Sequence, residues 1–355
     1  MKYHINISDD YYDYYDYDKL NVTLDYAVHD MICVKEEVRS FSQSFLPAFY
    51  SIVFLAGVAG NFLVVAIYAY FKKWKTKTDI YILNLAIADL LLLFTLPFWA
   101  GNAVHGWVFG IPLCKITAAI YAMNFSTNMQ FLACISIDRY HAIIQPQGHP
   151  ITRSTRKLCS FVWIVAFFLC VPELTFRMVI TFHGRYVCLA MFPTSWGKMA
   201  KIIIDILEIA LSFVLPLLII LICYSAIARI LLKSSRAKKS QPLKVLAAVV
   251  IVFILTQLPY NILKLWKTIH VIFHLIQDCG TIKITDVALQ VSETLALFHS
   301  CLNPILFFFM GTSFKMHIIN IAKHYGCWKR QDSMITEEIP MDCEDSAEQT
   351  NSFTI

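Results

Sequence analysis

The sequence has little charge: only 15% of its 355 residues are Asp, Glu, Lys or Arg, whereas soluble domains average about 25%. Apolar residues account for 57% of the chain, and the mean hydropathy is +0.58. This composition is too apolar for a soluble chain of two ordinary domains and argues against a soluble enzyme. It also excludes the disordered and collagen-like classes. We therefore expect the lipid bilayer to be the solvent for most of this chain.

Several chemical motifs are absent as well. The sequence has no His/Cys spacing typical of a metal site, no glycine-rich phosphate loop and no nucleophile elbow. We therefore predict no enzymatic activity and no metal centre, and expect the lone loop histidines His183 and His274 to face solvent. No internal repeat is apparent, which disfavours a transporter or channel. The first 40 residues lack a basic stretch followed by an apolar core, so the first crossing is expected to act as the targeting signal.

Seven long apolar runs stand out in the sequence. A helix that crosses the hydrocarbon core needs about 20 such residues. The sequence therefore predicts an all-α membrane protein whose residues 41–312 form a seven-transmembrane helix bundle. The runs are Phe45–Phe71, Ile80–Ala103, Leu113–Ile144, Leu158–Phe176, Ile202–Ile230, Val245–Ile269 and Val287–Met310.

Lysine and arginine are unevenly distributed among the connections between these runs. The connections after crossings one, three and five and the segment after crossing seven hold 16 of them, whereas the opposite connections hold five. Because cytoplasmic loops carry the excess of positive charge, we expect the N-terminus outside the cell and the C-terminus in the cytoplasm. This topology accounts for the basic loops, so no nucleic-acid partner is predicted.

Both ends of the chain are acidic. Residues 1–39 have a net charge of −5 and residues 332–355 one of −7, which leaves +17 for the body. We assign residues 1–40 to an extracellular Tyr-rich segment, with N-glycosylation acceptors at Asn6 and Asn21, and residues 327–355 to a disordered cytoplasmic tail. The basic amphipathic stretch 313–326 is expected to form a short helix on the membrane surface. Cys327 is a candidate for palmitoylation, with an unmodified thiol as the alternative.

Four of the eleven cysteines fall on the predicted outer side, where oxidising conditions favour disulfides. They are Cys33, Cys114, Cys188 and Cys279, and spacing alone allows three pairings. We favour Cys114–Cys188, which would hold the second outer loop over the mouth of the bundle. Cys33–Cys279 would then tie the N-terminal segment to the last outer loop.

Polar and proline motifs occur in most of the crossings, in a definite order along the chain. They are Gly60-Asn61, Leu85-Ala86-Ile87-Ala88-Asp89, Asp138-Arg139-Tyr140, Trp163, Pro216 with Tyr224, Pro259, and Asn303-Pro304. This order resembles the rhodopsin-like G-protein-coupled receptors. Further marks are similar to those of chemokine receptors: Thr95-Leu96-Pro97-Phe98-Trp99, His105-Gly106-Trp107 before Cys114, Gln257-Leu258-Pro259-Tyr260-Asn261, Ser292-Glu293-Thr294, and His299-Ser300-Cys301 before Leu302-Asn303-Pro304. Tyr81–Ala100 and Phe298–Met310 further resemble the atypical, scavenging members.

The resemblance implies two clusters of polar residues inside the bundle. Asp89 would bind sodium together with the side chains of Asn124, Asn128, His299 and Ser300, and a purely structural polar network is the alternative. Asp138 would hold Arg139 until crossing six swings outward. The complete activation switch would comprise Asp138, Arg139, Tyr140, Tyr224, Pro259, Asn303 and Pro304.

Glu293 is expected in the outer half of the bundle, about three helical turns from Pro304. The resemblance implies that it meets the basic N-terminus of a chemokine, flanked by Tyr50, Trp99 and Tyr121. A salt bridge from Glu293 to Lys264 is the alternative.

The acidic run from Asp9 to Asp18 suits tyrosine sulfation and would steer basic chemokines towards the bundle. An unmodified, solvated tail is the alternative. The tyrosines of this run are Tyr11, Tyr12, Tyr14, Tyr15 and Tyr17.

Three positions depart from the pattern of signalling chemokine receptors. His141 stands where they carry leucine, Gln147 stands where many carry a bulky apolar residue that docks into the G protein, and Phe307 replaces the tyrosine of the Asn-Pro-x-x-Tyr motif. We therefore expect weak or absent G-protein coupling. Phosphorylation of Ser and Thr residues in the acidic tail would provide a site for β-arrestin.

The resulting prediction is a receptor of the plasma membrane and endosomes that binds homeostatic CC chemokines and internalises them for degradation. The alternative is a conventional G-protein-coupled CC chemokine receptor that guides chemotaxis.

Overall fold

The computed structural model describes residues 35–71, 77–144, 153–182, 184–193, 195–233, 241–273 and 278–310. Several predicted features lie outside these ranges: the tyrosines from Tyr11 to Tyr17, Asn6, Asn21, Cys33, Gln147, residues 313–326, Cys327 and the C-terminal tail. For Phe307 the structure describes the helical backbone but not the side chain.

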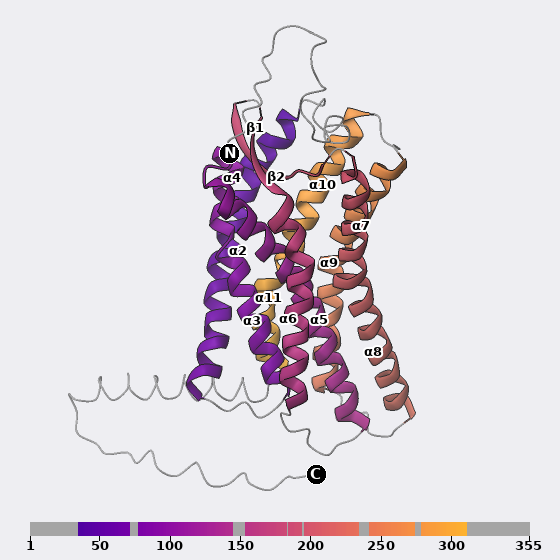
Figure 1. Cartoon of the computed structure of the whole chain (residues 1–355). Coiled ribbons are helices and arrows are strands. Elements are labelled where there is room, and N and C mark those ends of the chain that lie inside the picture. Colours follow the sequence, from indigo (N-terminus) through magenta and orange to yellow (C-terminus); the bar gives the residue numbers. More distant parts are fainter. Residues whose placement is uncertain are drawn as a thin grey trace, which may run out of the picture. The chain divides into compact units, whose positions relative to one another are not determined.

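The helices of the described residues form seven consecutive rods in one bundle (Figure 1). The predicted seven-helix architecture is therefore confirmed. The rods are, in chain order, α2 (Glu36–Phe71); α3 (Lys77–Leu93) with α4 (Leu96–His105); α5 (Gly110–Ile144); α6 (Arg153–Phe176); α7 (Gly197–Ile209) with the π-helical turn η2 (Ala210–Val214) and α8 (Leu215–Lys233); α9 (Gln241–Phe273); and α10 (Cys279–Leu297) with α11 (His299–Met310).

Each rod is longer than the apolar run that predicted it. Helix α9, for example, has 33 residues and is about 50 Å long, whereas the hydrocarbon core is about 30 Å thick. The helices therefore continue into water, where their end turns need capping.

Helix α2 begins at Glu36, inside the segment 1–40 that was assigned above to the extracellular Tyr-rich segment. Glu36 and Glu37 lie in its first turn, where acidic side chains interact favourably with the positive end of the helix dipole.

The N-cap of α10 is the carboxylate of Asp278. It accepts hydrogen bonds from the backbone N–H of Thr281 at 2.8 Å and from the Thr281 hydroxyl at 3.0 Å. These bonds favour the charged carboxylate and hold the pKa of Asp278 below its usual range. Asp278 therefore caps the first turn of the last rod.

Three rods are interrupted at places that bear on the site. Helix α3 ends just before Thr95, whose hydroxyl donates to the Leu92 carbonyl at 2.6 Å, and Pro97 opens the first turn of α4. The turn η2 precedes Pro216 and interrupts the α-helical register between α7 and α8. Phe298 separates α10 from α11.

A two-stranded antiparallel hairpin, which was not predicted from the sequence, connects α6 to α7. Strand β1 (Arg177–Phe182) pairs with β2 (Arg185–Ala190), with Val179 opposite Cys188. Gly184 adopts a φ of 72° in the turn, a conformation that glycine accommodates without strain. Figure 1 shows the hairpin at one end of the bundle, beside the start of α5.

Apolar side chains lie on both the inside and the outside of the bundle. Val64, Leu85 and Leu92 are fully buried, whereas Ile52, Phe168 and Ile222 are more than 60% exposed. Within the described residues, four of the rods (α2, α3–α4, α6 and α7–α8) are by length and composition apolar enough to cross a membrane. An apolar exterior of this kind is stable only against lipid.

Gly60 provides a test of how closely α2 packs against α11. A Cβ atom at this position would lie 2.8 Å from Cγ of Pro304, a rigid ring atom. We expect Gly60→Val to lower the stability of the bundle by about 1–3 kcal/mol, the usual range for overpacking. The matched control is Ala59→Val, an exposed position on the same helix. Equal apparent melting temperatures for the two purified variants would contradict this packing.

Candidate functional site

A cavity of about 620 Å³ opens at the end of the bundle that carries the hairpin. Its walls come from α2, α4, α5, α6, α7, α9 and α10, and the hairpin of β1 and β2 covers part of it. Tyr50, Trp99, Tyr121 and Glu293, which were predicted to act together, all line this cavity. Helices far apart in the sequence therefore bring the predicted ligand-binding residues to one place.

The aromatic residues of the cavity are packed tightly against one another. The ring centroids of Trp99 and Trp107 are 5.3 Å apart, and Phe125 lies 5.0 Å from Tyr121 and 5.1 Å from Tyr260. The Trp99 indole nitrogen and the Tyr121 hydroxyl are buried without a hydrogen bond of normal geometry. A buried polar group without a partner is costly, so the Trp99 nitrogen is suited to a ligand that supplies an acceptor, whereas the Tyr121 hydroxyl lies beside the Glu293 carboxylate.

Most charged residues of the cavity form ion pairs with one another. The Lys264 ammonium lies 2.7 Å from Glu208, and Lys201 lies 3.0 Å from Asp205. Thr268 donates to the same Asp205 carboxylate at 3.1 Å. These contacts join α7 to α9 beside the cavity.

Glu293 differs from the other acids of the cavity. Lys264, the partner considered for it from the sequence, is bound to Glu208 instead. Within the described residues, Glu293 has no basic group within ion-pair distance, and the Tyr121 hydroxyl lies beside its carboxylate. A carboxyl group beside aromatic rings, with no basic partner at ion-pair distance, is suited to an ammonium or guanidinium group of a ligand.

The ion pair of Glu208 with Lys264 in the cavity was not predicted from the sequence. A signal was present, because Asp205 and Glu208 lie three residues apart in an apolar run and so share one helix face. Carboxylates on a membrane helix are costly and are expected to have partners.

Asp89 lies at the centre of the second predicted cluster and is fully buried. Its Oδ1 accepts hydrogen bonds from Asn124 at 3.1 Å, Asn128 at 3.1 Å and Ser300 at 3.2 Å. Its Oδ2 accepts one from Asn303 at 2.7 Å, and Nε2 of His299 lies 3.7 Å from Oδ1. The structure therefore brings α3, α5 and α11 together around one carboxylate.

Comparison with known proteins identifies the family. The family described as "7 transmembrane receptor (rhodopsin family)" matches residues 60–307. The chain is 52% identical to atypical chemokine receptor 4 of Bos taurus over 100% of both chains, and 52% identical to that of Homo sapiens over 99% of both. It is 38% identical to C-C chemokine receptor type 9 of Homo sapiens over 84% of this chain and 82% of that one. The chain belongs to the chemokine receptors of the rhodopsin family.

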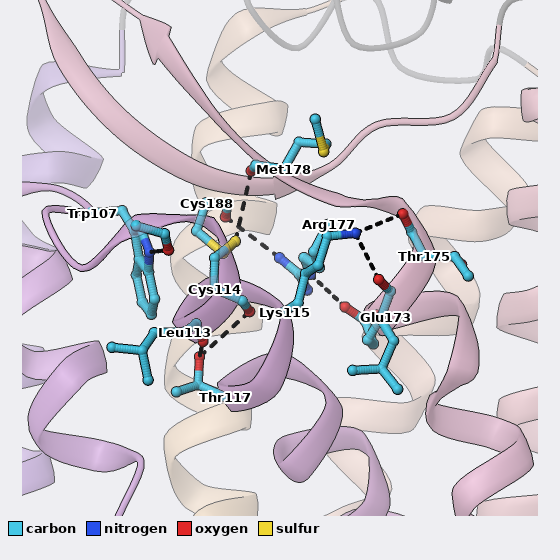
Figure 2. Close-up of a disulfide and its surroundings, with 12 residues drawn as sticks. Trp107, Leu113, Cys114, Lys115, Thr117, Glu173, Thr175, Arg177, Met178 and Cys188 are labelled. Carbon is cyan, nitrogen blue, oxygen red and sulfur yellow. Dashed lines mark hydrogen bonds and ion pairs between the residues drawn. A yellow bond between two sulfur atoms is a disulfide. The ribbon is translucent and has the colours of Figure 1, made fainter. Parts of the chain in front are cut away.

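This membership confirms the prediction of a membrane-embedded, non-enzymatic receptor for chemokines. A disulfide joins Cys114 of α5 to Cys188 of β2, the strand that covers part of the receptor's cavity (Figure 2). Cys279 is also disulfide-bonded, and its predicted partner, Cys33, lies outside the described residues. The favoured Cys114–Cys188 pairing therefore fixes the hairpin to the start of α5.

Side chains around the disulfide anchor the hairpin further. Figure 2 shows Lys115 pointing towards the end of α6, where its ammonium donates to the carbonyls of Leu174 at 2.6 Å and Thr175 at 2.9 Å. Arg177 at the start of β1 pairs with Glu173. A lysine at these carbonyls satisfies acceptors that the helix end leaves free, so the entry to the hairpin is held in place.

Gln257 connects the cavity to the Asp89 cluster. Its side chain is 2% exposed, and its amide donates to the Ala296 carbonyl at 3.0 Å and lies 3.1 Å from Nδ1 of His299. The Ala296 carbonyl sits next to the break between α10 and α11. Gln257 therefore ties α9 to the interrupted seventh rod, and His299 joins it to Asp89.

At the other end of the bundle, the residues of the predicted switch are only partly in contact. Asp138 accepts a hydrogen bond from Thr78 at 2.8 Å, and no ion pair joins it to Arg139 among the described residues. The Tyr140 ring lies 5.7 Å from His141, and the Tyr224 hydroxyl is buried without a hydrogen bond of normal geometry. Pro259 lies within α9, whereas Asn303 and Pro304 lie in α11, with Asn303 bound to Asp89. The expected restraint of Arg139 by Asp138 is therefore replaced by a contact between Asp138 and α3.

Replacing Gln257 tests the tie between α9 and the seventh rod. Gln257→Leu would remove the only α9 donor described for the Ala296 carbonyl, and we expect a loss of about 1–3 kcal/mol of stability. Gln130→Leu is the control, because among the described residues the Gln130 amide bonds only to Ser126 of its own helix. Thermal unfolding of both purified variants measures the difference, and a smaller loss for Gln257→Leu than for the control would contradict the tie.

Proposed function

We propose that this receptor scavenges CC chemokines: it binds homeostatic CC chemokines at the cell surface, internalises them for degradation, and couples weakly or not at all to G proteins. The observation that carries this proposal is the 52% identity, over the whole chain, to relatives named atypical chemokine receptor 4. The lower identity to C-C chemokine receptor type 9 favours this reading over a conventional signalling receptor.

The charge distribution of the cavity supports a basic ligand. Because its other acids are neutralised by Lys201, Lys264 and Arg177, Glu293 offers the free negative charge. A chemokine N-terminus that enters past β2 would place its cation beside Glu293, Tyr50 and Tyr121. The unpaired Trp99 nitrogen supplies a donor for a peptide carbonyl of the same segment.

The proposed topology places this cavity outside the cell. The uneven distribution of lysine and arginine supports it, and the disulfides at the cavity end suit an oxidising compartment. The residues that precede α2 would then extend from the cavity rim, and their tyrosines, when sulfated, would attract basic chemokines before the cavity binds the chemokine N-terminus.

Three substitutions support weak G-protein coupling. Gln147 replaces an apolar anchor whose burial contributes about 1.5–3 kcal/mol at an interface, and Phe307 removes a hydroxyl that would bond towards Tyr224. His141 changes the segment after Arg139. A phosphorylated acidic tail would then leave β-arrestin as the main cytoplasmic partner, with Cys327 palmitoylated near the inner leaflet.

We further propose that the Asp89 cluster binds sodium. Sodium prefers oxygen ligands, as other hard cations do. The cluster contains the Asp89 carboxylate and the Ser300 hydroxyl, and Oδ1 of Asn124 is buried nearby without a hydrogen bond. An unpaired oxygen beside a buried carboxylate is an arrangement that a cation stabilises. Asn128, Asn303 and His299 would then orient the carboxylate.

Replacing Glu293 tests the ligand-binding role of the cavity. We expect Glu293→Gln to weaken chemokine binding by about 10- to 100-fold, because a charge-assisted hydrogen bond contributes about 1.5–3 kcal/mol. Glu36→Gln is the control for net charge, since Glu36 is exposed in the first turn of α2. Binding of a labelled CC chemokine to cells that express each variant at equal surface levels gives the comparison. If both variants bind equally well, Glu293 does not contact the ligand.

Uptake and signalling measured in the same cells test the scavenging role. We expect a panel of labelled CC chemokines to include ligands that are internalised and degraded, with no inhibition of cAMP production. The controls are cells without the receptor and cells with a conventional CC chemokine receptor. Robust cAMP inhibition that pertussis toxin blocks would overturn the proposal and favour the chemotactic alternative.

A further inference from the structure

A second groove, of about 670 Å³, lies on the outer surface of α10, away from the ligand cavity. It is bordered by the start of α2 on one side and by α9 on the other. The residues that line it are Glu37, Val38 and Phe41 of α2, Pro259 and Leu263 of α9, and Lys283, Ile284, Val287, Ala288, Val291, Ser292 and Leu295 of α10.

The groove occupies one face of α10, and the ligand cavity occupies the opposite face. Ile284, Val291 and Leu295 are 72%, 42% and 40% exposed, whereas Leu289 and Glu293 line the cavity. Spacings of seven and four residues place the first three side chains on one stripe of the helix. The groove therefore faces the bilayer.

The length of the groove matches one leaflet. From Lys283 to Leu295 the helix rises about 18 Å, and one leaflet contributes about 15 Å of hydrocarbon. A single acyl chain lying along α10 would therefore fill the groove from its polar end to Pro259 and Leu295.

The polar end of the groove carries one charge of each sign. The Lys283 ammonium lies 3.4 Å from the Glu37 carboxylate, and the two side chains are 29% and 83% exposed. An exposed pair of this kind contributes little and separates readily. Its charges complement a zwitterionic headgroup, with the phosphate at Lys283 and a quaternary ammonium at Glu37.

We propose that this groove is a binding site for a zwitterionic phospholipid of the phosphatidylcholine type, with its headgroup at Glu37 and Lys283 and one acyl chain along α10. A bound lipid would hold the start of α2 against α10, where Lys35 already pairs with Asp286 at 2.6 Å. The proposed topology determines only which leaflet supplies the lipid. The lipid site does not depend on which chemokine the receptor binds.

Photo-labelling tests the acyl-chain part of this site. The receptor is placed without ligand in nanodiscs of phosphatidylcholine that contain a small fraction of phosphatidylcholine with a diazirine in one acyl chain, and labelled peptides are mapped by mass spectrometry. We expect labelling of residues 283–295 to exceed that of the exposed face of α8, and Ala288→Trp, which fills the groove, to lower it by about tenfold through lost apolar contact. Leu218→Trp, at an exposed position on α8, is the control and should leave it unchanged.

A second comparison tests the headgroup part. In nanodiscs with equal amounts of phosphatidylcholine and phosphatidylglycerol, we expect the diazirine form of phosphatidylcholine to label residues 283–295 more strongly than the diazirine form of phosphatidylglycerol. The double variant Glu37→Gln, Lys283→Gln should abolish this preference. Thermal unfolding of each variant confirms that the bundle is intact.

Two outcomes would overturn the site. One is labelling of α10 that equals that of α8 or is unaffected by Ala288→Trp. The other is cross-linking of this face to a second receptor copy, with labelling that rises when the receptor is diluted to one copy per nanodisc. Chemokine binding is not a readout here, so failure of this site leaves the scavenging proposal untouched.

Discussion

The buried carboxylate of Asp89 constrains the arrangement of the bundle around it. A carboxylate in a membrane interior is costly unless several donors surround it, and here the donors come from Asn124 and Asn128 of α5 and from Ser300 and Asn303 of α11. Because α3 carries the acceptor, three rods must meet at one depth with a defined rotation. The close approach of Gly60 to Pro304 brings α2 to the same level.

In the half of the bundle that carries the cavity, charges are paired both across helices and within them. The pairs Lys264–Glu208 and Lys201–Asp205 lie along α7 and α9, and Asp286 binds both Lys35 and Lys267. Among the described residues, this pairing leaves Glu293 of α10 without a basic group at ion-pair distance. The proposed selectivity of the cavity for a basic ligand would therefore depend on how completely its other charges are paired, and not on the net charge of the cavity wall.

The sequence predicted the seven rods and the members of the Asp89 cluster, because apolar length and buried polar residues are local signals with strong energetic consequences. It could not predict that Glu208 is the partner of Lys264, because this pairing depends on the rotation of α7 about its axis. The π-helical turn at Ala210–Val214, which interrupts the helical register after α7, has no sequence signature. The hairpin was missed because Arg177–Ala190 has no regular alternation. The contact of Asp138 with Thr78 likewise depends on how α3 and α5 pack.

The two sites are linked by a short polar path. Gln257, at the level of Pro259, contacts the Ala296 carbonyl and His299, and His299 lies beside Asp89. A ligand that shifts α9 against α10 would have to stretch the bond to Ala296 or carry the start of α11 with it. Either change alters the position of His299 relative to the carboxylate. Through these contacts a proposed ligand in the cavity would act on the Asp89 cluster without a long-range rearrangement, because one amide side chain spans the break in the seventh rod.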